Sequence, residues 1–248
     1  MDFKFDKPSH IFALILLLIS FILIFILPIF TFIISIDTNE LLDTIDIPEI
    51  VAVQSQLFVI AIFILVPFAW YYIVNKSNFK DIKSRIKLVS QNIDKAFLWG
   101  ILAAIIIFVV IFIIEIILIS SGFEQQDLSN FPELQKLFSW PVMFFLIAIQ
   151  PIGEEIYFRG FLFDKLENYA GGPFAVIITA ILFGIAHMSY GKEIPVIMII
   201  IMGLVLGFIV YRTKNLYSAI IAHIVFNVSS FTLAYLGMEL LNETSLIL

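Results

Sequence analysis

Long runs of apolar residues alternate with short polar segments along the whole chain. A helix that crosses the hydrocarbon core of a bilayer needs about 20 apolar residues. The pattern therefore predicts an all-α, polytopic membrane helix bundle of about seven transmembrane helices, or of eight if a further span escapes the pattern. The seven predicted spans are His10–Ile36, Ile50–Val74, Phe97–Ser120, Trp140–Phe163, Pro173–Met188, Pro195–Tyr211 and Tyr217–Leu236. Pro28 and Pro67 lie inside two of them and predict a kink or an early helix end.

The basic residues predict an orientation. Segment 76–95 contains six Lys and Arg residues, whereas segment 37–49 contains five acidic residues and no basic one. With seven spans and a cytoplasmic N-terminus, twelve of the fourteen Lys and Arg residues fall on the cytoplasmic side, and only Lys136 and Lys192 fall outside. Basic loops favour the cytoplasm, so the N-terminus is predicted to be cytoplasmic. An eighth span would reverse the downstream half.

The composition excludes several classes of protein. Hydrophobic residues make up 61% of the chain and charged residues only 14%, which is far from the soluble globular average and excludes intrinsic disorder. The chain has no cysteine, so disulfides, zinc–thiolate sites and thiol nucleophiles are absent. A net charge of −6 provides no general basic surface for nucleic acid. The expected partner of the surface is the lipid bilayer.

Polar residues are distributed unevenly between the two halves. Residues 1–139 place them almost only in loops, whereas residues 140–230 carry acids, histidines and amides inside the predicted spans. Ionisable residues inside a membrane are costly and are functional candidates by default. We therefore expect three N-terminal helices over residues 1–139, a functional core of four helices over residues 140–237 and a C-terminal tail over residues 238–248.

The fourth span contains two adjacent glutamates and an arginine. Glu155 and Arg159 are four residues apart, so they share a helix face and can form an ion pair. Glu154 points about 100° away from Glu155 and lacks this counter-charge. The cluster can support catalysis, and it can also simply fasten the helix to its neighbours.

Two later spans carry further polar groups. The fifth span contains Phe183 and, one turn later, His187; the histidine can equally be interfacial, and the phenylalanine ordinary packing. The seventh contains His223 and Asn227 on one face, which can donate to a developing negative charge or form an interhelical clasp. If all helices stand upright in the membrane, Glu154 and His223 lie at similar depths. His187 would then lie about 10 Å farther from the predicted cytoplasmic side than these two residues.

Together, the motifs Glu154-Glu155-x-x-x-Arg159, Phe183-x-x-x-His187 and His223-x-x-x-Asn227 resemble the three signature motifs of the CPBP intramembrane proteases. This family includes CAAX prenyl endopeptidases and bacteriocin-processing or immunity proteins. The resemblance covers residues 140–230, and the Gly203-x-x-x-Gly207 run also fits it. It implies an integral membrane protein with an active-site cavity that faces the cytoplasm. The Ile-, Phe- and Lys-rich composition suggests a prokaryotic cell membrane.

The resemblance also implies roles for the motif residues. Glu154 and His187 would activate the attacking water, and His223 and Asn227 would stabilise the oxyanion. Glu155, Arg159 and Phe183 would support the site. No cofactor is required by this interpretation and no metal ligand is assigned, although Glu154, His187 and His223 could hold a divalent metal such as zinc.

The function expected on this basis is intramembrane peptide-bond hydrolysis. The substrate would be a peptide or a prenylated protein, plausibly one that loses a C-terminal tripeptide in CAAX-type processing. The alternatives are a protease for peptide or bacteriocin processing or immunity, and a non-catalytic membrane scaffold of the same fold. A small transporter is a weaker interpretation, because no inverted repeat is visible.

Overall fold

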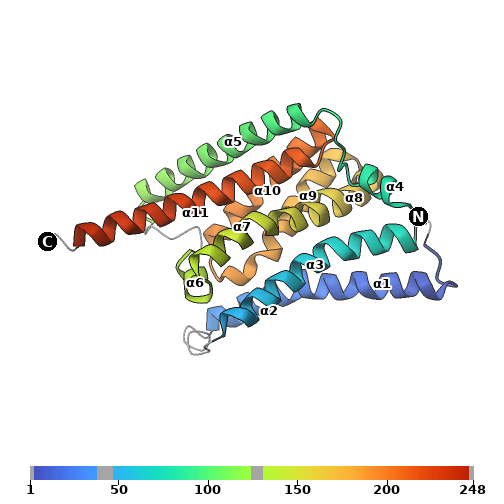
Figure 1. The fold of residues 1–248 in the computed structure, drawn as a ribbon, viewed down its shortest axis with the longest axis horizontal. Coiled ribbons are helices and arrows are strands. Elements are labelled where there is room, and N and C mark those ends of the chain that lie inside the picture. The colour runs from blue at the N-terminus through green and yellow to red at the C-terminus, as the bar shows by residue number, and fades with distance from the viewer. Residues whose placement is uncertain (1–2, 38–46, 124–130, 246–248) are drawn as a thin grey trace.

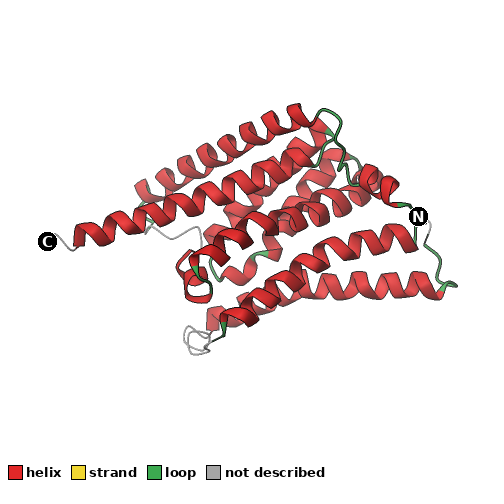
Figure 2. Cartoon of the chain, in the orientation of Figure 1, coloured by secondary structure: helices red, strands yellow, loops and turns green. Residues whose placement is uncertain are grey.

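A computed structural model of the chain describes residues 3–37, 47–123 and 131–245, and these residues form helices joined by short loops (Figures 1 and 2). The all-α fold expected from the sequence is confirmed. The elements, in chain order, are α1 (Pro8–Phe21), η1 (Ile22–Ile26), α2 (Leu27–Asp37), α3 (Glu49–Ile73), α4 (Phe79–Arg85), α5 (Ile93–Ser120), α6 (Phe131–Leu137), α7 (Trp140–Glu155), η2 (Ile156–Leu162), α8 (Phe163–Ala170), α9 (Gly172–Ala186), η3 (Met188–Tyr190), α10 (Glu193–Thr213) and α11 (Tyr217–Ser245).

Six helices in the described part of the chain are long and apolar enough to cross a membrane. They comprise Pro8–Ile34, Glu49–Ile73, Ile93–Ser120, Trp140–Ala170, Glu193–Thr213 and Tyr217–Leu240. The remaining predicted span corresponds to α9, an apolar helix of 15 residues. The chain is therefore an integral membrane protein with a polytopic helical fold. Helix α11 continues to Ser245, so residues 238–245 of the expected tail are helical.

The prolines inside the first two spans do not end the helices. Pro28 follows η1, a π-helical segment that contains Ile24, the residue four positions before the proline. A proline ring clashes with the carbonyl at this position, and a widened turn moves that carbonyl away. Pro67 lies within α3, which runs uninterrupted to Ile73. The expected early ends are therefore wrong, and one of the two prolines instead follows a local widening of the helix.

The helices pack around α7, η2 and α8, and most neighbours are antiparallel, whereas α5 and α11 run parallel to each other (Figure 1). Helices α1 and α3 lie side by side on one side of this central segment, and α5 and α11 on the other. Helices α9 and α10 form a tight hairpin, in which a Cβ atom at Gly203 would lie 3.0 Å from Ala180 Cα and one at Gly207 3.4 Å from Val176 Cα. The glycine spacing in the sixth span thus permits close helix contact, as expected.

One end of the bundle gathers the loops rich in Lys and Arg, and we call it the basic end. It is formed by the α4–α5 loop and the α10–α11 turn, which are joined by a hydrogen bond from Leu216 N to Lys87 O (2.8 Å). Lys87 and Lys214 both form ion pairs with Glu167 of α8, at 2.9 and 2.7 Å. Helix α9 begins near this end, because Gly172 packs against Tyr211 at the end of α10. The α9–α10 turn therefore lies away from the basic end.

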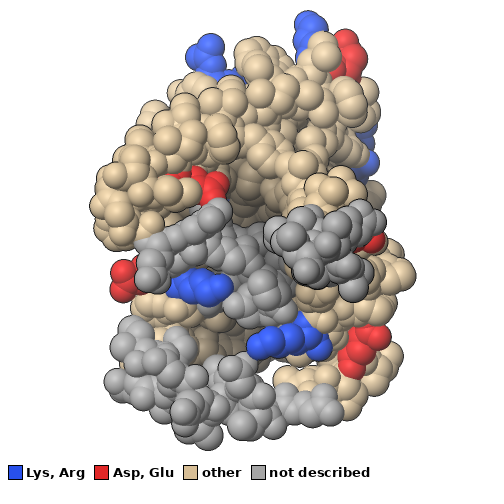
Figure 3. Space-filling view, turned by 90° about the vertical axis from the view of Figure 1, so that its left-hand side faces the viewer, with Lys and Arg blue, Asp and Glu red and all other residues tan. Residues whose placement is uncertain are grey.

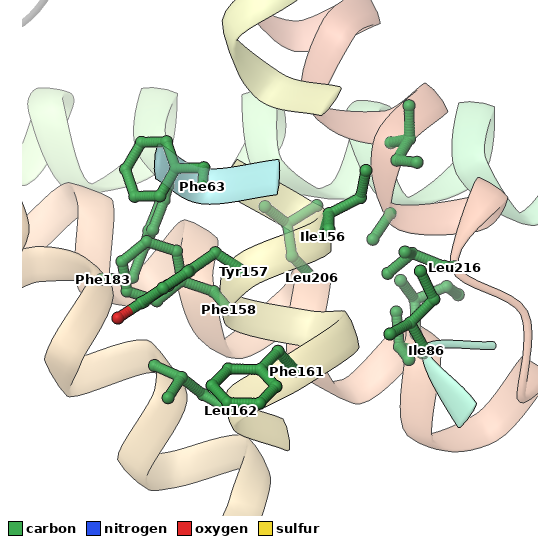
Figure 4. Packing of buried hydrophobic residues seen from close by; sticks show 14 of the residues in the cluster. Phe63, Ile86, Ile156, Tyr157, Phe158, Phe161, Leu162, Phe183, Leu206 and Leu216 are labelled. Carbon is green, nitrogen blue, oxygen red and sulfur yellow. The ribbon is translucent and has the colours of Figure 1, made fainter. Parts of the chain in front are cut away.

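A core rich in aromatic residues fills the interior between η2 and the basic end (Figure 4). Phe158 contacts Phe183 edge-to-face, with ring centroids 5.1 Å apart, and Phe161 contacts Tyr71 in the same way at 5.5 Å. Ile86 and Leu216, from the two loops of the basic end, are fully buried in the same cluster. The central part of the bundle is thus closed toward the basic end by tightly packed apolar side chains.

Candidate active site

Glu154 lies in the last turn of α7 with its carboxylate almost completely buried among polar side chains from three helices. Gln150, one turn earlier on α7, donates a hydrogen bond from Nε2 to Glu154 Oε1 at 2.7 Å. His187 Nε2 lies 3.9 Å from Oε1, and His223 Nε2 lies 3.7 Å from Oε2. The carboxylate therefore faces one imidazole with each of its oxygens.

Glu155 forms the second centre of the cluster. Its Oε1 accepts a hydrogen bond from Arg159 Nη1 at 2.9 Å, as the spacing of four residues predicts. The same oxygen lies 2.9 Å from His223 Nδ1. All three side chains are buried, so Glu155 links the arginine of its own segment to the histidine of α11.

Arg159 is held inside the protein by groups from several elements. It lies on η2, the π-helical segment that follows Glu155, and its side chain is completely buried. Nη2 donates to the carbonyl oxygen of Gly203 at 3.3 Å, and the guanidinium lies 4.2 Å from the centroid of the Phe183 ring. A buried cation needs such compensation, because it has lost its hydration. Gly203 both permits the contact between α9 and α10 and offers its carbonyl to this cation.

His187 follows the last residue of α9, where the helix ends. Its Nδ1 lies 2.7 Å from the carbonyl oxygen of Phe183, and a carbonyl can only accept a hydrogen bond. Nδ1 therefore carries the proton, and in the neutral ring Nε2 presents its lone pair toward Glu154. The buried Phe183 ring contacts both imidazoles, at centroid distances of 4.6 Å to His187 and 5.7 Å to His223. Phe183 thus contacts both histidines of the cluster.

The structure brings six of the seven residues singled out from the sequence into one connected cluster and leaves Asn227 beside it. Asn227 lies one turn after His223 on α11, is half-buried and makes no side-chain hydrogen bond within the described part of the protein. Sequence reasoning missed Gln150, although its distance of four residues from Glu154 places both on one helix face. That spacing was the available signal.

The donor atoms do not form a metal-ligand set. Among the described residues, no group of three or more His, Asp or Glu side chains is arranged to hold a metal ion. Glu154, His187 and His223, the residues named for this alternative, face one another at the oxygen–nitrogen distances given above.

The site is less buried on the side of His187 than elsewhere. The His187 side chain is 13% exposed, against 4% for Glu154 and 3% for His223. His187 is also next to the α9–α10 turn, away from the basic end. Figure 3 views the molecule from the end opposite the basic end and shows a hollow in its surface there. The cluster is therefore more accessible on the side of His187, while the aromatic core closes the other side.

Comparison with known proteins agrees with the geometry. Residues 136–229 match the family model described as type II CAAX prenyl endopeptidase Rce1-like. These residues are similar to that family, and we call them the Rce1-like domain. Its bounds enclose every residue of the cluster, from Gln150 to His223, and also Asn227. Of the helices that precede the Rce1-like domain, α3 packs against α7 and η2, and α5 packs against α10 and α11. Helix α1 reaches the domain through a hydrogen bond between the hydroxyl groups of Ser20 and Tyr157.

A curated relative matches part of the same region. The chain is 33% identical over 88 residues to the Bacillus subtilis (strain 168) protein named "Putative membrane peptidase YdiL". This match covers 35% of the chain and 35% of the relative, so the chain spans about a third of the length of the curated protein it matches. No solved structure matches the chain.

Proposed function

We propose that the cluster around Glu154 is the active site of an intramembrane endopeptidase that hydrolyses a peptide bond with an activated water. The observation that carries this proposal is the position of the Glu154 carboxylate, buried between the Nε2 atoms of His187 and His223. A carboxylate and an imidazole that face each other inside an apolar bundle can bind and deprotonate one water molecule. The Rce1-like domain and the name of the curated relative support the same class of activity.

In the proposed mechanism, Glu154 is the general base. A water held between Glu154 Oε1 and His187 Nε2 donates one hydrogen bond to each, since both atoms can accept. Glu154 takes the proton as the oxygen attacks the carbonyl carbon of the substrate. It then delivers the proton to the leaving nitrogen, so the carboxylate is regenerated. Gln150, which donates to Oε1, orients the carboxylate for this exchange.

His223 and Asn227 are the proposed stabilisers of the oxyanion. With Nδ1 donating to Glu155, His223 can also donate from Nε2 only as an imidazolium, which carries both protons. Asn227 is one turn away and has its side-chain amide available for the same oxygen.

Glu155 and Arg159 are positioning residues in this proposal. They touch neither substrate nor water, but they fix the ring of His223 through Nδ1 and fasten η2 to α10 through the carbonyl of Gly203. Phe183 fixes both imidazole planes from one side. Because donors must be in place before charge develops, such preorganisation is a large part of the expected catalytic effect.

The substrate we propose is a membrane-bound peptide or protein, with a prenylated CAAX-type C-terminus as the leading candidate. The family model that matches residues 136–229 supports this choice, and the bilayer is the medium in which a prenyl group would reach the site. We propose residues 140–237 as the catalytic unit and residues 1–139 as helices that enclose it. The compartment that the opening faces stays a prediction. The resemblance implies that the cavity faces the cytoplasm, whereas the positive charges predict that the basic end, which is opposite the opening, is cytoplasmic.

The experiment is peptide cleavage by the purified protein in liposomes. Matched peptides with and without a farnesylated cysteine are incubated with wild-type protein and with Glu154→Gln, which keeps the shape of the side chain but cannot accept the proton. Glu115→Gln is the matched control, because Glu115 is an intramembrane glutamate on α5, outside the cluster. We expect cleavage by the wild type and by Glu115→Gln, and a loss of at least about 100-fold for Glu154→Gln.

The two peptides separate the specific proposal from the general one. Cleavage of the farnesylated peptide alone supports CAAX-type processing, and equal cleavage of both supports a peptidase without prenyl recognition. Cleavage that persists in Glu154→Gln would overturn the assigned mechanism. A folded wild type that cleaves neither these nor a library of membrane peptides would favour the scaffold alternative.

A further inference from the structure

A cavity with a basic rim lies between the start of α5 and the end of α10, outside the candidate active site. Its volume is about 410 Å³. The lining residues come from α5, from the end of α10 and from the two loops of the basic end, and they include Lys95, Trp99, Phe208, Arg212 and Asn215. We propose that this cavity binds the phosphate headgroup of an anionic phospholipid.

The charge of the lining favours an anion. Lys95 and Arg212 are both exposed, and neither forms an ion pair or a side-chain hydrogen bond within the described residues. No Asp or Glu is among the described residues that line the cavity, and Asp94, beside Lys95 in sequence, is exposed but is not part of the lining. The cavity therefore presents two positive charges and no described negative charge to a ligand.

The neighbouring surface favours a lipid over a free phosphate. Trp99 and Phe208 are exposed at the cavity and belong to helices that are long enough to cross the membrane. The exposed apolar faces continue from them toward the membrane interior, through Leu102 on α5 and Leu204 on α10. Tryptophan is enriched where membrane and water meet, and basic pockets between transmembrane helices bind anionic headgroups. A phosphate at the rim would therefore have its acyl chains beside apolar side chains.

The buried floor of the cavity is connected to the helix that carries His223. Asn215 is buried and accepts a hydrogen bond from Tyr217 N at the start of α11. Its Nδ2 donates to the carbonyl oxygens of Val89 and Gln91, both at 3.1 Å, in the loop that leads to α5. A ligand that bridges α5 and α10 above Asn215 would hold these three segments together. We therefore expect the lipid to stabilise the folded protein as well as to bind.

The experiment uses the full chain in nanodiscs of phosphatidylcholine with or without phosphatidylglycerol. Lipid retention is measured by native mass spectrometry, and stability by the midpoint of thermal unfolding. The test variant is Lys95→Gln/Arg212→Gln. The matched control is Lys4→Gln/Lys80→Gln, which removes two exposed cations from the same end of the protein but outside the cavity. A second variant, Lys95→Arg/Arg212→Lys, keeps the charge.

We expect one tightly retained phosphatidylglycerol per protein and a higher unfolding midpoint in its presence. Removing both cavity cations should weaken binding about thirtyfold, which corresponds to about 2 kcal/mol and to about 1 kcal/mol per basic residue at a membrane surface. The control pair and the charge-preserving pair should each retain binding within about threefold. If Lys95→Gln/Arg212→Gln does not fold, the charge-preserving variant Lys95→Arg/Arg212→Lys is the remaining test. Loss of phosphatidylglycerol binding by that variant would then count against the site.

Two results would overturn the proposal. Equal loss of binding in the test and control pairs would show general attraction to the basic end, without a specific cavity. A thermal shift produced equally by inorganic phosphate in pure phosphatidylcholine nanodiscs would show that the ligand is a soluble phosphate. None of these measurements depends on peptidase activity, so their outcome is independent of the proposed function.

Discussion

His223 Nδ1 and Arg159 Nη1 both lie 2.9 Å from the same atom, Glu155 Oε1. The other oxygen of that carboxylate, Oε2, has no hydrogen-bond partner within the described residues. One buried atom thus joins a residue of the proposed oxyanion site to a buried cation on η2. The arrangement makes the position of His223 depend on an ion pair that takes no direct part in the chemistry.

Removal of the buried cation should therefore destabilise the fold. We expect Arg159→Met to lower the free energy of unfolding by about 3–5 kcal/mol, because it removes one partner of the buried ion pair with Glu155. Denaturation in detergent micelles measures this. The double variant Arg159→Met/Glu155→Gln should recover part of the loss, since neither charge is then left alone. A double variant that is as unstable as the sum of both singles would contradict the pairing.

Gln150 offers a test of the positioning of Glu154. Gln150→Leu removes the donor to Glu154 Oε1 but keeps most of the side-chain volume. A hydrogen bond to a charged group is worth about 1.5–3 kcal/mol, so we expect a loss of about ten- to a hundredfold in kcat, with little change in the unfolding midpoint. Gln56→Leu, at a half-buried glutamine of α3, is the control. If both variants retain full activity, Gln150 has no role in orienting the carboxylate.

The α9–α10 contact predicts a contrast between two glycines. A methyl group at Gly203 would lie 3.0 Å from Ala180 Cα, which is backbone and cannot turn aside, whereas one at Gly237 would meet no atom within 4 Å. Gly203→Ala should lower the free energy of unfolding by about 1–3 kcal/mol and reduce activity, because the carbonyl that binds Arg159 also shifts. Gly237→Ala should leave stability unchanged or slightly raised. Equal changes in the free energy of unfolding for the two variants would mean that the close contact between α9 and α10 does not limit stability.

Metal removal gives a direct test of the site chemistry. Since Glu154, His187 and His223 are not arranged as a metal-ligand set, we expect peptide cleavage to survive incubation with a membrane-permeant chelator. Cleavage is measured in liposomes before and after treatment. Loss of activity that zinc restores would contradict this expectation and would require the three side chains to close around an ion.

The absence of cysteine from the chain allows its orientation to be measured directly. Single-cysteine variants at Ser90, in the α4–α5 loop, and at Ser121, directly after α5, place one thiol at each end of a spanning helix. From the positive charges we expect a membrane-impermeant maleimide to label Ser121→Cys but not Ser90→Cys in intact cells. The opposite labelling would reverse the orientation and place the α9–α10 turn on the cytoplasmic side.

The sequence was sufficient for the class of fold and for most members of the cluster. Apolar runs predicted the spanning helices, and the spacing of four residues predicted the contact between Glu155 and Arg159. The depth estimate, which assumed upright helices, failed for His187. Helix α9 instead has 15 residues and ends at His187, where the histidine reaches Glu154.

Other features depended on tertiary packing and had no local signature. The Glu155 oxygen shared by two donors joins residues 159 and 223, and no periodicity links positions so far apart. The π-helical segment η2 turns Arg159 toward the carbonyl of Gly203, which an ideal helix drawn from the sequence does not show. The cavity at Lys95 and Arg212 likewise arises from two helix ends that meet only in the folded bundle.

The shortness of α9 has a consequence for the surrounding lipid. Fifteen helical residues extend about 22 Å, whereas the hydrocarbon core of a bilayer is about 30 Å thick. Such a hydrophobic mismatch is relieved by thinning of the adjacent leaflet. The η3 segment, which follows His187, would then lie nearer to headgroups and water than to the bilayer centre. A peptide backbone that enters next to α9 would cross less hydrocarbon than at any of the six longer helices.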